Sequence, residues 1–75
     1  MESKVEAYLR EKAKEKGMKL TPQRIAVYTE LATRNDHPSA EEIYEALKEK
    51  IKGITLPTVY RNLLALETAG LVMRV

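Results

Sequence analysis

The chain has 75 residues, of which 44% are hydrophobic and 32% are charged, with a net charge of +2 and no cysteine. This size predicts one domain with a modest core and little room for a deep catalytic cleft. The lack of cysteine excludes disulfides, thiolate zinc sites and cysteine nucleophiles, and it suits a reducing cytoplasm, where we expect the protein. Apolar runs are far shorter than the ~20 residues of a membrane span, and no stretch resembles a signal peptide.

Positive charge gathers at the two ends of the chain. Residues 1–24 carry seven Lys/Arg against four Glu, residues 25–50 carry three against six acidic residues, and residues 51–75 carry three against one. If the two ends meet on one surface, that surface attracts phosphate. A set of solvated, mixed-charge helices is the plainer interpretation, and charge alone favours it.

The first half of the chain predicts two helices. The first covers residues 3–16 and ends at Gly17, because glycine commonly follows a last helical turn. The second covers residues 22–34. Thr21 is its expected N-cap, and Pro22 suits the first helical position, where an N–H group would lack a partner anyway.

A third helix is predicted over residues 40–51. The stretch Ser39-Ala40-Glu41-Glu42 forms a capping box at its start, in which the serine and a glutamate bond each other's backbone N–H groups. The capping box accounts for these two adjacent glutamates without a catalytic role. With a single histidine and no glycine-rich phosphate loop in the chain, we do not expect an enzyme.

The fourth predicted helix covers residues 56–69, begins after Thr55 and ends before Gly70. The β-branched and partly alternating residues 71–75 then predict a short strand. A strand without a partner is incomplete, since sheets need neighbouring strands.

On a helical wheel, the fourth helix has one apolar face, formed by Val59, Leu63 and Leu66. Its opposite face is small or hydrogen-bonding and carries no acid before Glu67. A helix that enters the major groove of DNA needs such a face, because an early carboxylate would repel phosphate. Leu64 also projects from the outer half and is suited to contact another protein, another helix or thymine methyl groups.

Four side chains near the start of this helix are candidates for DNA contacts. Thr58 can bond a phosphate at the helix N-terminus. Arg61 can pair with guanine, and Asn62 can reach adenine if it rotates outward, while the Tyr60 ring can pack on a thymine methyl or a sugar. Wheel geometry alone favours a plainer interpretation, in which Tyr60 is a boundary aromatic and Arg61 a solvated charge.

Three sequence blocks together resemble the DNA-binding domain of the ferric uptake regulator family, the iron-, zinc- and peroxide-responsive bacterial repressors. The blocks are LTPQR at 20–24, HPSAEEIYEAL at 37–47, and TVYRNL at 58–63 followed by GLV. They occur in the expected order and spacing over residues 17–73. The motifs do not separate the iron, zinc and peroxide branches of the family.

The resemblance implies a mainly α, winged helix-turn-helix fold over residues 1–75, with four helices and a wing that is here truncated to its first strand. In the family, the helix with TVYR enters the major groove, and its tyrosine and arginine touch bases, which implies Tyr60 and Arg61. A basic residue before the TP motif reaches the minor groove, which implies Lys19. The arginine of TPQR lies near backbone phosphate, which implies Arg24.

The resemblance also gives His37 a role, because family sensors use a histidine in this loop to bind the regulatory metal. The other ligands belong to a C-terminal metal-binding dimerisation domain, which we expect to be missing from this chain as a fragment. We therefore expect no cofactor here, and Fe, Zn or Mn at His37 only in a full-length parent. We expect homodimers through the missing domain or through exchange of the wing strand.

Two functions follow as hypotheses. The first is sequence-specific binding to double-stranded DNA, at an AT-rich palindromic operator, by the N-terminal domain of a metal- or peroxide-responsive regulator. The alternative is a winged-helix protein-interaction module without DNA binding, because fold does not fix function. Neither involves a membrane.

Overall fold

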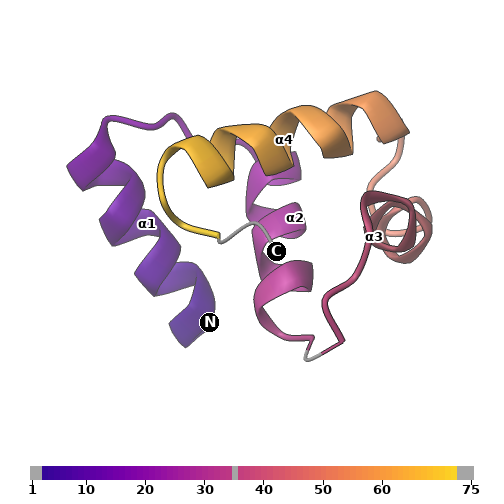
Figure 1. Ribbon diagram of the computed structural model, residues 1–75, viewed down its shortest axis with the longest axis horizontal. Helices are drawn as coiled ribbons and strands as arrows, with labels where there is room; N and C mark the ends of the chain where they lie inside the picture. The colour runs from indigo at the N-terminus through magenta and orange to yellow at the C-terminus, as the bar shows by residue number, and fades with distance from the viewer. Residues whose placement is uncertain (1–2, 35, 73–75) are drawn as a thin grey trace.

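A computed structural model of the chain describes residues 3–34 and 36–72. Within them lie four helices, α1 (Lys4–Lys16), α2 (Pro22–Ala32), α3 (Ala40–Leu47) and α4 (Leu56–Thr68). In Figure 1, α4 crosses in front of α2, with α1 on one side and α3 on the other. Because α2 packs against all three other helices, it is the centre of the bundle. The mainly α prediction is confirmed.

Every helix begins at a hydroxyl side chain that accepts a hydrogen bond from a first-turn N–H group. The four N-caps are Ser3, Thr21, Ser39 and Thr55. At α3 the predicted capping box is complete, since the Ser39 N–H also donates to the Glu42 carboxylate at 2.8 Å. Three of the caps confirm the sequence prediction, and Ser3 was expected inside the first helix.

Glycines close α1 and α4 in the same way. Gly17 has a φ of 67° and Gly70 a φ of 76°, in the left-handed region that glycine enters without a Cβ clash. At each end, two backbone N–H groups turn back to carbonyls of the last turn, Met18 to Ala13 and Leu71 to Leu66 among them. The predicted roles of the two glycines are confirmed, although α4 ends at Thr68, one residue before the predicted 69.

The prediction for α3 was wrong at its C-terminal end, because the helix stops at Leu47 and not at 51. The N–H groups of Lys50 and Ile51 both donate to the Leu47 carbonyl, at 3.0 and 2.9 Å, which tightens the chain into a turn. Hydrophobic periodicity continues through Ile51 because this side chain still packs against the core. Similarly, α2 ends two residues before the predicted 34.

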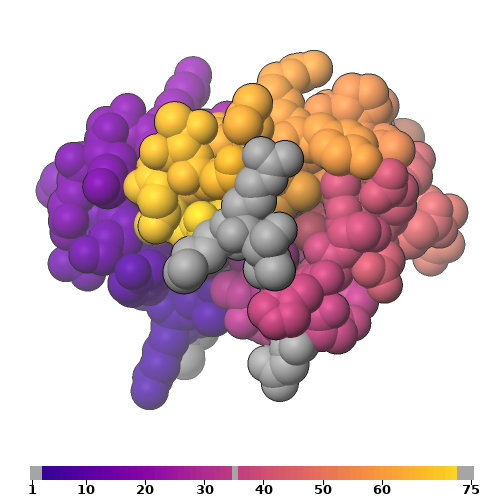
Figure 2. All heavy atoms as spheres, in the orientation of Figure 1, coloured from indigo at the N-terminus to yellow at the C-terminus, as the bar shows by residue number. Residues whose placement is uncertain are grey.

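The core is a single cluster with contributions from all four helices and from the turn before α4. Its buried residues are Leu9, Val27, Tyr28, Ala40, Ile43, Leu47, Ile54, Val59 and Leu66. The space-filling view shows the C-terminal end of α4 at the front of the molecule (Figure 2). The core thus fixes α4 while leaving its other side accessible.

The predicted strand at residues 71–75 is only partly within the described structure. Leu71 and Val72 lie in a bend and pack against the core, and no strand occurs in the described ranges. Residues 73–75 lie outside them. None of the described helices has the length and apolar character that crossing a bilayer requires.

Candidate nucleic-acid interface

Arg24, in the first turn of α2, joins the preceding turn to α4. Its Nε donates to Asn62 Oδ1 at 2.9 Å, and its Nη1 donates to the Lys19 carbonyl at 2.7 Å. The Lys19 side chain is exposed. Two segments that are 38 residues apart in the sequence therefore lie side by side. The two basic ends of the chain meet here, which is the condition for a phosphate-attracting surface.

Arg61 is exposed on α4 and lies beside the end of α1. It lines an open groove together with Lys16, Met18 and Leu64. Within the described part of the chain, no carboxylate pairs with Arg61, so its positive charge faces solvent. Lys16 and Arg61 are thus two cations that line a groove together with the apolar side chains of Met18 and Leu64. Lys16 was not among the predicted residues, because only tertiary packing brings it to α4.

Tyr60 is half exposed and lies on the side of α4 that faces α3. Its hydroxyl donates to Glu41 Oε2 at 2.7 Å. This hydrogen bond lowers the pKa of the Glu41 carboxyl and raises the pKa of the Tyr60 hydroxyl. Glu41 was not among the predicted site residues. A signal was present, since the capping box uses Glu42 and leaves its neighbour Glu41 free for another partner.

Thr58 and Asn62 differ from the expected outward-facing donors. Thr58 is half-buried, and its hydroxyl lies 2.9 Å from the Thr55 hydroxyl at the helix cap. Asn62 is only 6% exposed, and its Nδ2 donates to the Thr58 carbonyl at 3.0 Å. Asn62 therefore lies on the inner side of α4, where its amide bonds protein groups and not the solvent-facing surface.

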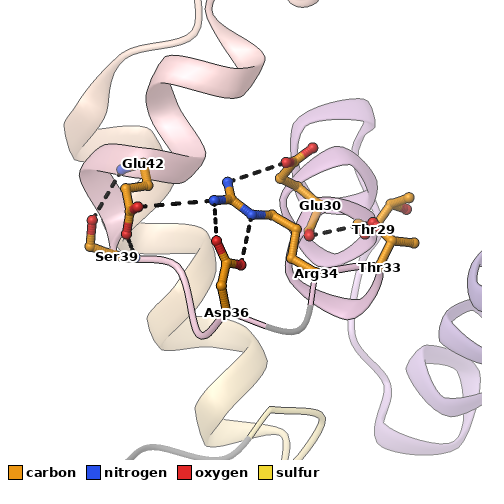
Figure 3. A network of polar contacts seen from close by, with 7 residues as sticks. All are labelled: Thr29, Glu30, Thr33, Arg34, Asp36, Ser39 and Glu42. Carbon is orange, nitrogen blue, oxygen red and sulfur yellow. Dashed lines mark hydrogen bonds and ion pairs between the residues drawn. The ribbon is translucent and has the colours of Figure 1, made fainter.

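Arg34 lies just beyond the end of α2, in the centre of a cluster of carboxylates (Figure 3). Its Nε and Nη2 donate to the two oxygens of Asp36 at 3.0 and 2.7 Å. Glu30 lies at 3.5 Å and Glu42 at 4.0 Å, so the guanidinium connects α2, the loop and the start of α3. The hydrogen bond to Arg34 is the main cause that lowers the pKa of Asp36.

His37 is exposed, with a positive φ of 47°, in a loop beside an apolar groove lined by Tyr28, Leu71 and Val72. The neighbouring Asp36 carboxylate is engaged by Arg34. No group of three potential metal ligands occurs within residues 3–34 and 36–72. Because a metal site needs several donors, His37 by itself does not fit one.

Comparisons with known proteins agree on one family. The sequence profile of the ferric uptake regulator family matches residues 15–75. The peroxide operon regulator of Bacillus subtilis (strain 168) is 42% identical over 62 residues, which are 83% of this chain and 43% of that protein. The peroxide-responsive repressor PerR of Staphylococcus epidermidis is 41% identical over 56 residues, which are 75% of this chain and 37% of that protein.

The fold comparison gives the same result. A solved structure of PerR from Streptococcus pyogenes superposes with a TM-score of 0.81 at 32% identity, covering 88% of this chain and 45% of that one. That structure belongs to work on peroxide sensing and gene regulation by PerR. The chain therefore spans less than half the length of each of these relatives.

Proposed function

The chain belongs to the ferric uptake regulator family, a family of transcriptional regulators and not of enzymes, and we propose that it binds double-stranded DNA through α4 and the turn before α2. It is the DNA-binding part of a metal- or peroxide-responsive regulator. The observation that carries this proposal is the pair of hydrogen bonds from Arg24, which bring the Lys19 turn against α4. The basic first segment thereby contacts α4, which carries Arg61, and regulators of this family bind DNA.

Each proposed contact has a chemical reason. α4 enters the major groove, where Arg61 donates to a guanine and the half-exposed Tyr60 ring packs on a thymine methyl or a sugar. Lys19 reaches the minor groove, and Arg24 bonds a phosphate with the N–H groups that its protein partners leave free. Thr58, at the N-terminus of α4, is suited to a phosphate because the helix dipole favours an anion there.

The wing, the metal site and the homodimer are features of a whole regulator. There, a wing completes the winged-helix fold, and a C-terminal domain binds the regulatory metal and forms the homodimer. His37 contributes one ligand for Fe, Zn or Mn only when that domain supplies the others. Two DNA-binding parts then contact the half-sites of an AT-rich palindromic operator in the cytoplasm, where tethering raises the effective concentration of the second part.

A salt titration on an AT-rich palindromic duplex tests DNA binding. The logarithm of the association constant should fall linearly with the logarithm of the salt concentration, since cationic side chains release counterions from phosphate. Arg61→Ala should weaken binding by roughly 5- to 150-fold and relax the preference for the palindrome over a scrambled duplex. Arg10→Ala is the matched control, because Arg10 pairs with Glu6 on α1. Binding that ignores salt, or an unchanged sequence preference in Arg61→Ala, contradicts the proposal.

Leu64 favours a second candidate function, which is binding to another protein. It is 62% exposed and lies in the groove beside Met18 and Ala65. An NMR titration with the duplex separates the two functions. Amide shifts at Arg61 and Lys19 on addition of the duplex support DNA binding. The alternative is supported if the duplex causes no shifts and the chain instead binds a protein, with binding that Leu64→Lys abolishes.

A further inference from the structure

We propose that Asn62 is a positioning residue for DNA binding, whose amide holds the Arg24 guanidinium, and through it the Lys19 turn, against α4. This inference rests on the proposed function and assigns Asn62 a role that differs from a base contact. Asn62 itself touches no DNA. It acts by fixing where Arg24 presents its remaining N–H groups to a phosphate.

Asn62 is buried on the inward side of α4. On α4, Asn62 follows Val59 by three residues and precedes Leu66 by four, so it occupies a position of the inward face. It is the one buried polar residue within the described part of the chain. A leucine would serve packing alone at this place, because burying an amide is unfavourable unless it is hydrogen-bonded.

The side-chain amide of Asn62 is hydrogen-bonded through both its nitrogen and its oxygen. Its Nδ2 donates to the Thr58 carbonyl at 3.0 Å, which fixes the orientation of the side chain on its own helix. Its Oδ1 is then directed to Arg24 Nε at 2.9 Å. The Asn62 side chain is therefore bonded at both ends and connects α4 to α2.

Arg24 keeps some of its N–H groups and its positive charge available for a ligand. A guanidinium has five N–H groups in one plane, and the protein bonds described here use one on Nε and one on Nη1, which leaves three for a ligand. Both acceptors are neutral, so neither cancels the positive charge. Because bonds at two separate nitrogens stop the plane from rotating, the free N–H groups keep one direction, as a bidentate phosphate contact requires.

Asn62→Asp is the decisive variant, because it keeps the size of the side chain and an acceptor for Arg24 while placing a negative charge beside the guanidinium. On the duplex, the magnitude of the salt slope should fall by about 0.9, the value for one phosphate contact, with an unchanged preference for the palindrome. Arg24→Gln should lower the slope equally, and the double variant should lower it no further. A role in packing alone would leave the slope unchanged.

Asn62→Leu tests positioning without a change of charge. In a heteronuclear NMR spectrum without DNA, the Nε–H of Arg24 should be protected from exchange with water in the unchanged protein and lose that protection in the variant. Duplex affinity should fall several-fold at constant circular dichroism. An unprotected Nε–H in the unchanged protein, or wild-type affinity in Asn62→Leu, overturns the inference.

Different results would contradict DNA binding itself and the positioning role of Asn62. If Arg24→Gln and Arg61→Ala leave duplex binding unchanged, the proposed function is wrong. If both weaken binding but Asn62→Asp keeps the wild-type salt slope, the function stands and the role of Asn62 is wrong.

Discussion

Arg24 and Arg34 lie near the two ends of α2, and their surroundings are opposite. Arg24 bonds a side-chain amide and a backbone carbonyl, both neutral. Arg34 bonds Asp36 through two nitrogens and lies within ion-pair distance of Glu30 and Glu42 (Figure 3). Both arginines are positioned by the fold, but only Arg34 has its charge compensated by the protein within the described residues.

One residue type therefore serves two purposes in this small domain. Arg34 connects the end of α2 to the loop and to the capping box of α3, so its charge stabilises the arrangement of the helices. Arg24 is held by neutral groups, which orient it without neutralising it, so its charge remains available for an anion. The two ends of α2 also have different neighbours, since the Arg24 end lies beside α4 and the Arg34 end beside His37.

The largest expected effect is at Arg24. Arg24→Gln should weaken duplex binding by about 10- to 150-fold at low salt, the range for a hydrogen bond to a charged group. Arg24→Lys is the matched control, because it keeps the charge and loses the planar fork. We expect it to retain the salt slope and to bind with intermediate affinity in fluorescence anisotropy. Equal losses in both variants would mean that the charge of Arg24 is not what the duplex contacts.

A smaller effect is expected at Arg34, and in stability instead of binding. Arg34→Gln should lower the melting temperature by a few degrees, measured by circular dichroism, with duplex affinity unchanged well below that temperature. The pKa of Asp36 is lowered in the folded state, so its pairing stabilises the fold above the ordinary aspartate pKa of about 3.9 and is lost as pH falls through the lowered value. The difference in melting temperature between the unchanged protein and Arg34→Gln should therefore disappear in acid.

Two results would contradict the separate roles of Arg24 in binding and Arg34 in stability. One is a loss of duplex affinity in Arg34→Gln as large as that in Arg24→Gln. The other is a melting-temperature gap that persists at a pH where Asp36 is protonated, because the gap would then have a cause other than this ion pair.

The smallest effect is expected at Glu41, where the structure places an acid beside a proposed base contact. Glu41→Gln keeps an oxygen acceptor for the Tyr60 hydroxyl and removes the negative charge. Duplex affinity should rise by less than about threefold, because exposed charges are strongly screened by salt and water. Glu45→Gln, one turn further along α3 and paired with Lys48, should leave affinity unchanged. A weaker complex in Glu41→Gln alone would mean that the carboxylate itself supports binding.

Much of the fold followed from short-range patterns. Thr21, Ser39 and Thr55 were identified as caps because an N-cap bonds a backbone group only three residues away, and the same locality applies to Gly17 and Gly70. The end of α3 was wrong because Ile51 continues the apolar spacing while the backbone has already turned.

The candidate site was only partly predictable. The family motifs indicated Tyr60, Arg61, Lys19 and Arg24 as DNA contacts, and these remain proposals. Asn62 was expected to reach adenine if it rotated outward, but it is buried, and its spacing from Val59 and Leu66 is that of the inner face. The partner that makes its burial favourable is Arg24, and no helical wheel includes a residue of another helix.

Sequence patterns alone were enough to predict where three of the four helices begin, which side of α4 is apolar and which family the motifs resemble, because caps, periodicity and motifs are encoded within a few neighbouring residues. Only the tertiary structure decided which arginine is neutralised, which acid holds Tyr60 and why an asparagine is buried in α4. The bonds of Asn62 and Tyr60 join side chains of different segments, so they form only once packing has brought these segments together. The ion pair of Arg34 with Asp36 is local, but it forms only in the conformation that the loop after α2 adopts.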